Sequence, residues 1–334
     1  MKDKILKFSI CLLMIFSVCA CGKKEELPVN GGGTTPPEKT LQIVDVNSKT
    51  RPYAVMINNN HAAWPISGLQ DAYIVYEIVV EGGITRMMAL YKDQDTAKIG
   101  SVRSSRHYFL DYVLENDAIY AHFGWSEPAR EDISKLGINN INGLYDSYTW
   151  RDTSLDRAYE HTAFTSTEKI KEYVNKKGYR TEANKDLLLN YSVDEINLDN
   201  MDGAIVANNV SIKYSYYHTS SYEYDATNKV YNRSMSGVTN TDLVTGEQYT
   251  VKNIITYQVE DVAHESIAKL RNLKNIGTGE GYYITNGYAV PITWTKDSRS
   301  GQTVYKYKNG TEIDVNDGNT FIQIQPKGQN LTIN

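Results

Sequence analysis

Short apolar runs mark the first part of the chain. Runs rich in Val, Ile, Met and Tyr, which are typical of strands, lie at residues 53–58, 72–80, 87–91, 99–102 and 118–123. Three other segments carry apolar residues at helical spacing, namely 106–114, 127–136 and 167–176. Mixed strands and helices predict an α/β or α+β arrangement here, and the pattern leaves the strand order open.

From about residue 209 the pattern becomes one of short strands. Runs rich in Tyr, Val, Ile and Thr lie at residues 210–217, 221–224, 229–233, 250–259, 281–285, 289–294, 303–307 and 320–325. Asn-Gly pairs at 286–287 and 309–310 fall between such runs and favour hairpins. One stretch, 264–270, predicts a helix among them. This half is therefore expected to be a mostly antiparallel β domain.

Together the two patterns predict an α+β protein with two domains, which is also what the chain length favours. We expect a mixed α/β N-terminal domain over residues 45–200. We expect a mostly antiparallel β C-terminal domain over residues 201–334.

The N-terminus has the features of an export signal. Lysines at positions 2, 4 and 7 precede an apolar run from Phe8 to Phe16, and Val18-Cys19-Ala20-Cys21 follows. A basic start, a short apolar core and small residues before the cleavage point are typical of a secretory signal peptide. The Val-Cys-Ala-Cys ending resembles a bacterial lipobox, which implies cleavage of residues 1–20 and a lipid on Cys21.

Residues 21–44 are expected to tether the folded part to the membrane. They are rich in Gly, Thr, Pro and charged residues and have little to bury. About 20 residues of such coil reach roughly 25 Å. We therefore expect the protein at the outer face of the cytoplasmic membrane, and the Lys-, Asn- and Ile-rich composition favours a Gram-positive cell.

Cysteine content and charge limit the function. All three cysteines lie at or before position 21, so the folded part has no disulfide framework and no thiol nucleophile. The net charge is −5, and it becomes −7 once residues 1–20, with three lysines and one aspartate, are removed. That charge argues against nucleic acid as a partner. The 26 tyrosines suit half-buried strands better than a binding surface.

The chain resembles the YerB family of bacterial lipoproteins, whose folded part is a two-domain DUF3048 unit. In the first half the resemblance rests on the segments RPYAVMINN (51–59), SGLQDA (67–72), YE (76–77), EGGITR (81–86), GSVRSSR (100–106) and YAH (120–122). In the second half it rests on YD (224–225), YNR (231–233), NII (253–255), GTGEGYY (277–283) and PITW (291–294). Two positions depart from the family pattern: Ser101 stands in place of a proline, and Glu160-His161-Thr162 in place of Pro-His-Asn. The resemblance implies the two-domain fold and no particular activity.

A polar cluster between a strand and a helix is the main candidate for binding. It comprises Ser101, Arg103, Ser104, Ser105 and Arg106. Guanidinium groups and backbone N–H groups at a helix start can bind a carboxylate or a phosphate. We count Arg86, Asn58 and Asn59 with this candidate site. The competing interpretation is an internal ion-pair network with Glu77, Glu81 or Asp111.

Glu77, Glu81, His122 and His161 are the candidates for catalysis. On a regular strand Glu77 and Glu81 would lie roughly 13 Å apart, whereas glycosidase carboxylates lie about 5–9.5 Å apart. The histidines show no metal-binding spacing, so we expect neither a metal site nor a cofactor.

Two functions follow from these patterns. The first is a binding or regulatory lipoprotein that holds peptidoglycan, a wall polymer or an envelope protein through the arginine cluster, and contacts the membrane through Cys21. The alternative is an envelope hydrolase or transferase that uses Glu77, Glu81 and the histidines. Convergence of Glu77, His122 and His161 on one cleft would favour the alternative.

Overall fold

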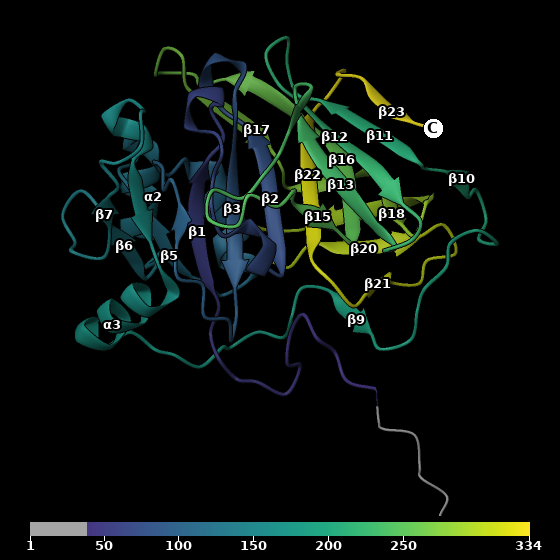
Figure 1. Cartoon of the computed structure of the whole chain (residues 1–334), viewed down its shortest axis with the longest axis horizontal. Coiled ribbons are helices and arrows are strands. Elements are labelled where there is room, and N and C mark those ends of the chain that lie inside the picture. Colours follow the sequence, from purple (N-terminus) through teal and green to yellow (C-terminus); the bar gives the residue numbers. More distant parts are fainter. Residues whose placement is uncertain (1–38) are drawn as a thin grey trace, which may run out of the picture. The chain divides into compact units, whose positions relative to one another are not determined.

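A twelve-stranded mixed sheet runs through both halves of the chain (Figure 1). The structure is a computed structural model, and it describes residues 39–334. The predicted signal peptide, the lipidation site Cys21 and most of the predicted tether lie outside the described residues. In spatial order the sheet contains β10 (Ile205–Val206), β19 (Tyr288–Lys296), β18 (Gly277–Thr285), β16 (Asn253–Ala263), β22 (Thr320–Pro326), β2 (Ile74–Val79), β3 (Thr85–Tyr91), β1 (Tyr53–Asn58), β5 (Ile119–His122) and β6 (Asn140–Asn142). Off this path, β17 (Arg271–Lys274) pairs with β16 and β20 (Val304–Tyr307) pairs with β19.

The two halves of the chain meet inside this sheet. Strand β2 of the first half pairs in parallel with β22 of the second half, in the register Ile74↔Thr320 to Ile78↔Ile324. Strand β22 also pairs in parallel with β16. Residues 39–334 accordingly form one compact unit. The boundary near residue 200 stays a prediction.

Four strands of the first half point the same way. Strands β1 and β2 are both antiparallel to β3, and β5 and β6 continue in parallel from β1. Their carboxyl ends therefore lie at the same edge of the sheet. We call this the carboxyl edge, made of the residues that follow β1, β2, β5 and β6. In open sheets with parallel strands, ligands commonly bind outside the carboxyl ends.

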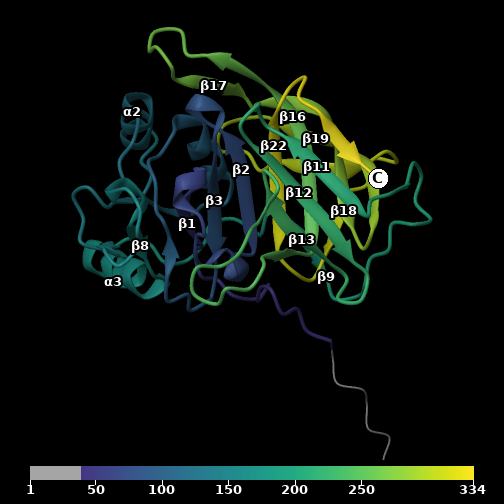
Figure 2. The same ribbon diagram turned by 45° about the horizontal axis from the view of Figure 1, so that its top comes forward.

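Both faces of the sheet are covered. Strand β2 is buried along its whole length, as expected for a strand with cores on both sides. On one face it packs with α1 (Leu110–Glu115) and α2 (Glu127–Lys135). On the other face lie α3 (Thr167–Lys177) and a second sheet. Figures 1 and 2 show the helices beside the N-terminal strands and the second sheet beside β16, β18 and β22.

The second sheet is antiparallel and belongs to the C-terminal half. Its order is β14 (Val238–Thr239), β13 (Val230–Met235), β12 (Thr219–Asp225), β11 (Asn209–Lys213) and β23 (Leu331–Ile333), with β15 (Thr250–Val251) paired to β13. Two small sheets join β21 (Asp314–Asn316) to β9 (Asn190–Ser192), and β4 (Ile99–Gly100) to β8 (Ala163–Thr165) and β7 (Trp150–Arg151). The 3₁₀ turns are η1 (His61–Ala63), η2 (Leu69–Asp71), η3 (Glu81–Gly83), η4 (His107–Phe109) and η5 (Tyr159–His161).

The predicted fold class is confirmed, with a mixed N-terminal sheet region and largely antiparallel C-terminal strands. The predicted helix at 264–270 is wrong. That segment is the tip of the β16–β17 hairpin, closed by a hydrogen bond from the His264 N–H to the Leu270 carbonyl. Most tyrosines serve the core, since fifteen of the 26 are buried. No helix within residues 39–334 is long and apolar enough to cross a membrane.

Candidate functional site

The segment 101–106 crosses the carboxyl edge between the ends of β1 and β5. The Arg103 N–H donates to the Met56 carbonyl of β1 (2.9 Å), and the Arg103 carbonyl accepts from the Phe123 N–H after β5 (2.9 Å). The Ser105 N–H donates to the Gly124 carbonyl at the same distance. These backbone bonds fix the segment like a short extra strand. They place its polar residues where the carboxyl ends of parallel strands meet.

Arg86 lies beneath this segment. It pairs in register with Asn58, so the two side chains share one face of the sheet. Arg86 is 6% exposed, and its Nη1 donates to the Ser104 carbonyl at 2.5 Å. Its Nε–H has no hydrogen-bond partner among the described residues. No carboxylate oxygen of residues 39–334 lies within 4.0 Å of its guanidinium nitrogens.

Two buried hydroxyls near Arg86 have no partner other than each other. Ser105 Oγ and Tyr120 OH make no hydrogen bond to any other group within the described residues. Burial raises the pKa of Tyr120, while the hydrogen-bonding interaction with the Ser105 hydroxyl, followed by the charges of Arg86 and Arg106, opposes the rise. We call Arg86, Ser105 and Tyr120 the Arg86 cluster. The Ser101 carbonyl accepts a hydrogen bond from the Asn58 N–H (2.8 Å), and the Ser101 Oγ is buried and has no hydrogen-bond partner within residues 39–334.

The charge of Arg86 is poorly compensated. Burial, followed by the charges of Arg106 and Arg103, lowers its pKa to about 9, against the opposing effect of Glu81. An unpaired cation in a buried position is costly unless an anion joins it. The Arg86 cluster thus has the donors and the charge for an anion.

Arg103 and Arg106 have acidic partners. Arg106 binds Glu81 through two nitrogens, at 2.7 and 2.8 Å. The Arg103 Nη2 lies 3.1 Å from Glu160 Oε1, and the Arg103 side chain is more exposed than that of Arg106. The internal ion-pair interpretation therefore describes Arg106, with Glu81 as its acid. Asp111 pairs instead with Arg299.

His161 adjoins the same face. Its Nδ1 lies 2.8 Å from the Asn58 amide nitrogen, and its Nε2 lies 3.6 Å from Glu160 Oε1. An amide N–H donating to Nδ1 selects the neutral tautomer with its proton on Nε2. Burial, followed by the charge of Arg103, lowers the pKa of His161. The ring is thus held neutral beside Arg103.

His122 is enclosed at the end of β5. Its ring contacts the Gly124 carbonyl (2.8 Å) and the Asn140 side chain (3.2 Å), and it is 0% exposed. Burial lowers its pKa to about 4. The ring orients the loop after β5 and does not reach a surface where a substrate could meet it.

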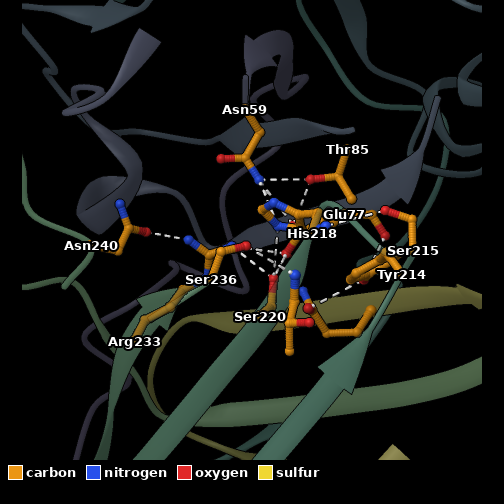
Figure 3. A network of polar contacts seen from close by, with 12 residues as sticks. Asn59, Glu77, Thr85, Tyr214, Ser215, His218, Ser220, Arg233, Ser236 and Asn240 are labelled. Carbon is orange, nitrogen blue, oxygen red and sulfur yellow. Dashed lines mark hydrogen bonds and ion pairs between the residues drawn. The ribbon is translucent and has the colours of Figure 1, made fainter. Parts of the chain in front are cut away.

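Glu77 lies on the opposite face of the sheet in a buried polar network (Figure 3). Its carboxylate accepts from Arg233 (2.8 Å) and Ser220 (2.9 Å), and it lies 2.9 Å from His218 Nε2. Thr85 and Asn59 donate to the same carboxylate, at 2.8 and 3.0 Å.

The network is closed to solvent and joins the two halves. Glu77 and Arg233 are both 0% exposed. Burial tends to raise the pKa of Glu77, but the Arg233 charge and the hydrogen bond from His218 hold it well below the usual range. Neighbouring residues alternate between faces of a sheet, so Asn59 joins this network while Asn58 faces Arg86. His218, Ser220 and Arg233 were not identified from the sequence.

The four catalytic candidates do not converge. Glu77 and His122 are enclosed in separate environments, whereas Glu81 and His161 lie at the carboxyl edge with Arg106 and Asn58 as partners. Within residues 39–334 no group of three His, Cys, Asp or Glu side chains is placed to hold a metal ion. What the carboxyl edge offers chemically is a set of cationic and hydroxyl donors.

Comparisons with known proteins agree with this architecture. Residues 40–180 match the N-terminal domain, and residues 210–322 the C-terminal domain, of a family described as "Protein of unknown function (DUF3048)". "Putative lipoprotein YerB" of Bacillus subtilis (strain 168) is 29% identical, with 98% of this chain and 96% of that protein covered. The crystal structure of YerB from Bacillus subtilis superposes with a TM-score of 0.73 at 28% identity, covering 85% of this chain and 94% of that one. The chain belongs to the DUF3048 family.

Proposed function

We propose that this protein is a membrane-anchored extracytoplasmic lipoprotein that binds an anionic group of a cell-envelope component at the carboxyl edge. The lipid anchor is supported by the signal and Val-Cys-Ala-Cys pattern ending at Cys21. It is also supported by the relative from Bacillus subtilis, which is named a lipoprotein. Peptidoglycan, a wall polymer and an envelope protein each carry carboxylates or phosphates that such a site could take.

One observation carries the binding proposal. Arg86 is a buried arginine with an unpartnered Nε–H and no acidic group in contact within the described chain. A structural arginine normally has an acid or several carbonyls as partners. A bound anion would supply both the missing charge and the missing acceptor.

The test separates binding from stability. Arg86→Met keeps the length of the side chain and removes the unpaired charge, so the free energy of unfolding should stay the same or rise. A ligand that binds the native state adds about 2.7 kcal/mol at one hundred times its dissociation constant. Phosphate should therefore raise the thermal midpoint of the wild type and leave that of Arg86→Met unchanged.

Arg130→Gln is the matched control, because Arg130 is an exposed arginine on α2 whose one acidic partner within the described part of the chain is Glu127. This variant should retain the response to phosphate. The proposal is contradicted if Arg86→Met strongly destabilises the protein and phosphate has the same effect on both variants. A pull-down on purified cell wall, with released fragments measured, compares the same variants; fragments released by the wild type would support the hydrolase alternative.

A further inference from the structure

A large hollow lies in the C-terminal half, over the strand that carries the GTGEGYY segment. Its volume is about 1020 Å³, at the upper end of the range of ligand pockets, about 300–1,000 Å³. The floor is formed by residues 256–260 of β16, 277–282 of β18 and 291–294 of β19. Ile205 of β10, Lys308 after β20, Lys327 after β22 and Leu331 of β23 line its sides. We call this hollow the β18 trough.

The side chains on the floor of the trough are mostly polar. Successive residues of a strand alternate between the two faces of a sheet. Tyr257, Ile292 and Trp294 belong to the core on the face covered by α1 and α2, so the residues between them face the trough. These are Thr256, Gln258, Glu280, Tyr282, Pro291 and Thr293.

The glycines of the segment place β18 on a support of aromatic rings. A Cβ at Gly279 would lie 2.7 Å from Trp294 Nε1, so only glycine lets the strand approach this ring so closely. Trp294 is 4% exposed, and its ring centre lies 4.9 Å from that of Tyr257. Strand β18 is also hydrogen-bonded to β16 and β19. Glu280 and Tyr282 are therefore presented from a firmly packed strand.

The floor offers both hydrogen-bonding groups and apolar surface. Glu280 and Thr293 are exposed and Tyr282 is half-buried, and within residues 39–334 none of these side chains is hydrogen-bonded to another residue. Pro291 and Ile205, which is 41% exposed, add apolar surface. Sugar rings carry hydroxyls that both donate and accept, together with apolar C–H faces. This mixture of a carboxylate, hydroxyls, a tyrosine ring and apolar side chains suits them.

The charges around the floor favour an anionic ligand. The lining holds three lysines and two glutamates, although the whole chain has a net charge of −5. Lys274 pairs with Glu260 at 2.6 Å, whereas no carboxylate of the described residues lies within 4.0 Å of the Lys308 or Lys327 ammonium. Lys308 lies on the β19 side and Lys327 on the β16 side, so the two flank Glu280 on β18. Each is free to pair with a carboxylate of a ligand.

Two other classes of ligand fit the trough less well. Strands β16 and β19 have hydrogen-bonded neighbours on both sides, so they offer no free edge to which an extended peptide could add. Acyl chains would bury the Glu280 carboxylate without a partner, which is costly.

We propose that the β18 trough binds a glycan chain whose sugars carry carboxylate groups. Sugar rings lie against Tyr282, their hydroxyls donate to Glu280, and their carboxylates pair with Lys308 and Lys327. The trough shares no residue with the Arg86 cluster, so this inference goes beyond the proposed function and does not depend on it.

The experiment compares two glycans that differ in one group. Residues 39–334, which form one compact unit, are titrated calorimetrically with chitotetraose and with the tetrasaccharide of alternating N-acetylglucosamine and N-acetylmuramic acid. The second carries a lactyl carboxylate on every other sugar. It should bind about tenfold more tightly, which corresponds to about 1.4 kcal/mol. The difference should shrink at high salt, because the attraction between exposed charges is screened.

The variants assign each part of the ligand. Lys308→Gln combined with Lys327→Gln should reduce the affinity for the carboxylated glycan to that for chitotetraose and leave the latter unchanged. Glu280→Ala should weaken both glycans about tenfold, because a hydrogen bond to a charged group is lost. Lys176→Gln is the matched control, since Lys176 is an exposed lysine on α3, on the opposite side of the molecule from β18 (Figures 1 and 2). It should change neither affinity.

The outcomes separate this inference from the proposed function. Equal affinity for the two glycans, no binding of either, or a preference that survives the double lysine variant would overturn the inference. So would loss of glycan binding in Arg86→Met, which would place the glycan at the carboxyl edge. Tighter, lysine-dependent binding of a hexaglutamate peptide would also overturn it, in favour of a protein partner. A failure of phosphate to stabilise the wild type would overturn the proposed function alone.

Discussion

The buried pair of Glu77 and Arg233 allows a sharp prediction about stability. Replacing Glu77 with Gln keeps the shape of the side chain and removes its charge. Arg233 then remains 0% exposed without its acid. His218 and Ser220, which lie 2.9 Å from the carboxylate, would face an amide instead.

The expected cost follows from that environment. Removing one member of a buried ion pair typically costs about 3–5 kcal/mol, because the other charge stays buried and uncompensated. Glu77 comes from β2 and Arg233 from β13, so the loss falls on the contact between the two halves. We expect Glu77→Gln to lower the free energy of unfolding by roughly this amount.

Urea unfolding of residues 39–334 at neutral pH measures this free energy. Glu260→Gln is the control, since the Glu260–Lys274 pair is largely exposed and should contribute no more than about 1 kcal/mol. If Glu77→Gln changes the free energy of unfolding no more than the control does, the reasoning about the network is refuted.

The pH dependence gives a second readout of the same variant. The pKa of Glu77 is lowered on folding, so its contribution is present above the unfolded-state value of about 4.3 and is lost as the pH falls below it. The difference between wild type and Glu77→Gln should therefore shrink as the pH falls below about 4. A difference that stays constant from neutral to acidic pH would contradict the assigned ionisation.

Two further predictions test the surroundings of the site. Burial lowers the pKa of His122 to about 4, so its ring should remain neutral in an NMR titration down to about pH 5, where an ordinary histidine with a pKa near 6.5 is charged. The contribution of the neutral ring to stability should be lost as the pH falls from about 6.5 to 4. Titration of His122 near pH 6.5 would contradict its burial. Gly281→Ala should cost about 1–3 kcal/mol, because a Cβ there would lie 2.4 Å from the Thr256 carbonyl oxygen. Glu280→Gln, at an exposed position of the same strand, should change the free energy of unfolding by less than about 0.5 kcal/mol. Equal effects of the two substitutions would contradict the packing.

The local pattern of apolar and polar residues predicted most helices and strands, because it reflects which face of each element is buried. Helices α2 and α3 were predicted almost to the residue by apolar spacing and by Pro128 and Gly137 at the ends of the first. The 264–270 segment shows the limit. Its composition favours a helix, but the pairing of β16 with β17 on either side makes it a hairpin tip.

Long-range pairing could not be predicted from local pattern. The parallel contact between β2 and β22 joins residues almost 250 positions apart, and no local signal specifies it. Arg233 did leave a trace, because it alternates with Tyr231 and Met235 on the buried face of β13. The period of two thus marks it as a buried cation, but only the fold shows that its acid is Glu77.

The candidate binding residues were likewise predicted in part from local sequence and in part only from the fold. The sequence grouped Arg103, Ser104, Ser105 and Arg106 because they are contiguous. Arg106 pairs with Glu81, whereas Arg86 has no acidic side chain in contact within residues 39–334, and this difference depends on tertiary packing. Tyr120 was noted only as part of the YAH segment, and the position of its buried hydroxyl beside that of Ser105 became apparent from the fold.

The central claim is that the Arg86 guanidinium is the group that holds an anion. The most direct measurement is the NMR signal of its Nε–H, assigned by its absence in Arg86→Met, during titration with phosphate. The account predicts a saturable shift of this signal and slower exchange with solvent, while the signal of exposed Arg130 stays in place. An Arg86 signal that phosphate leaves unchanged, or that moves only as Arg130 does, would contradict it.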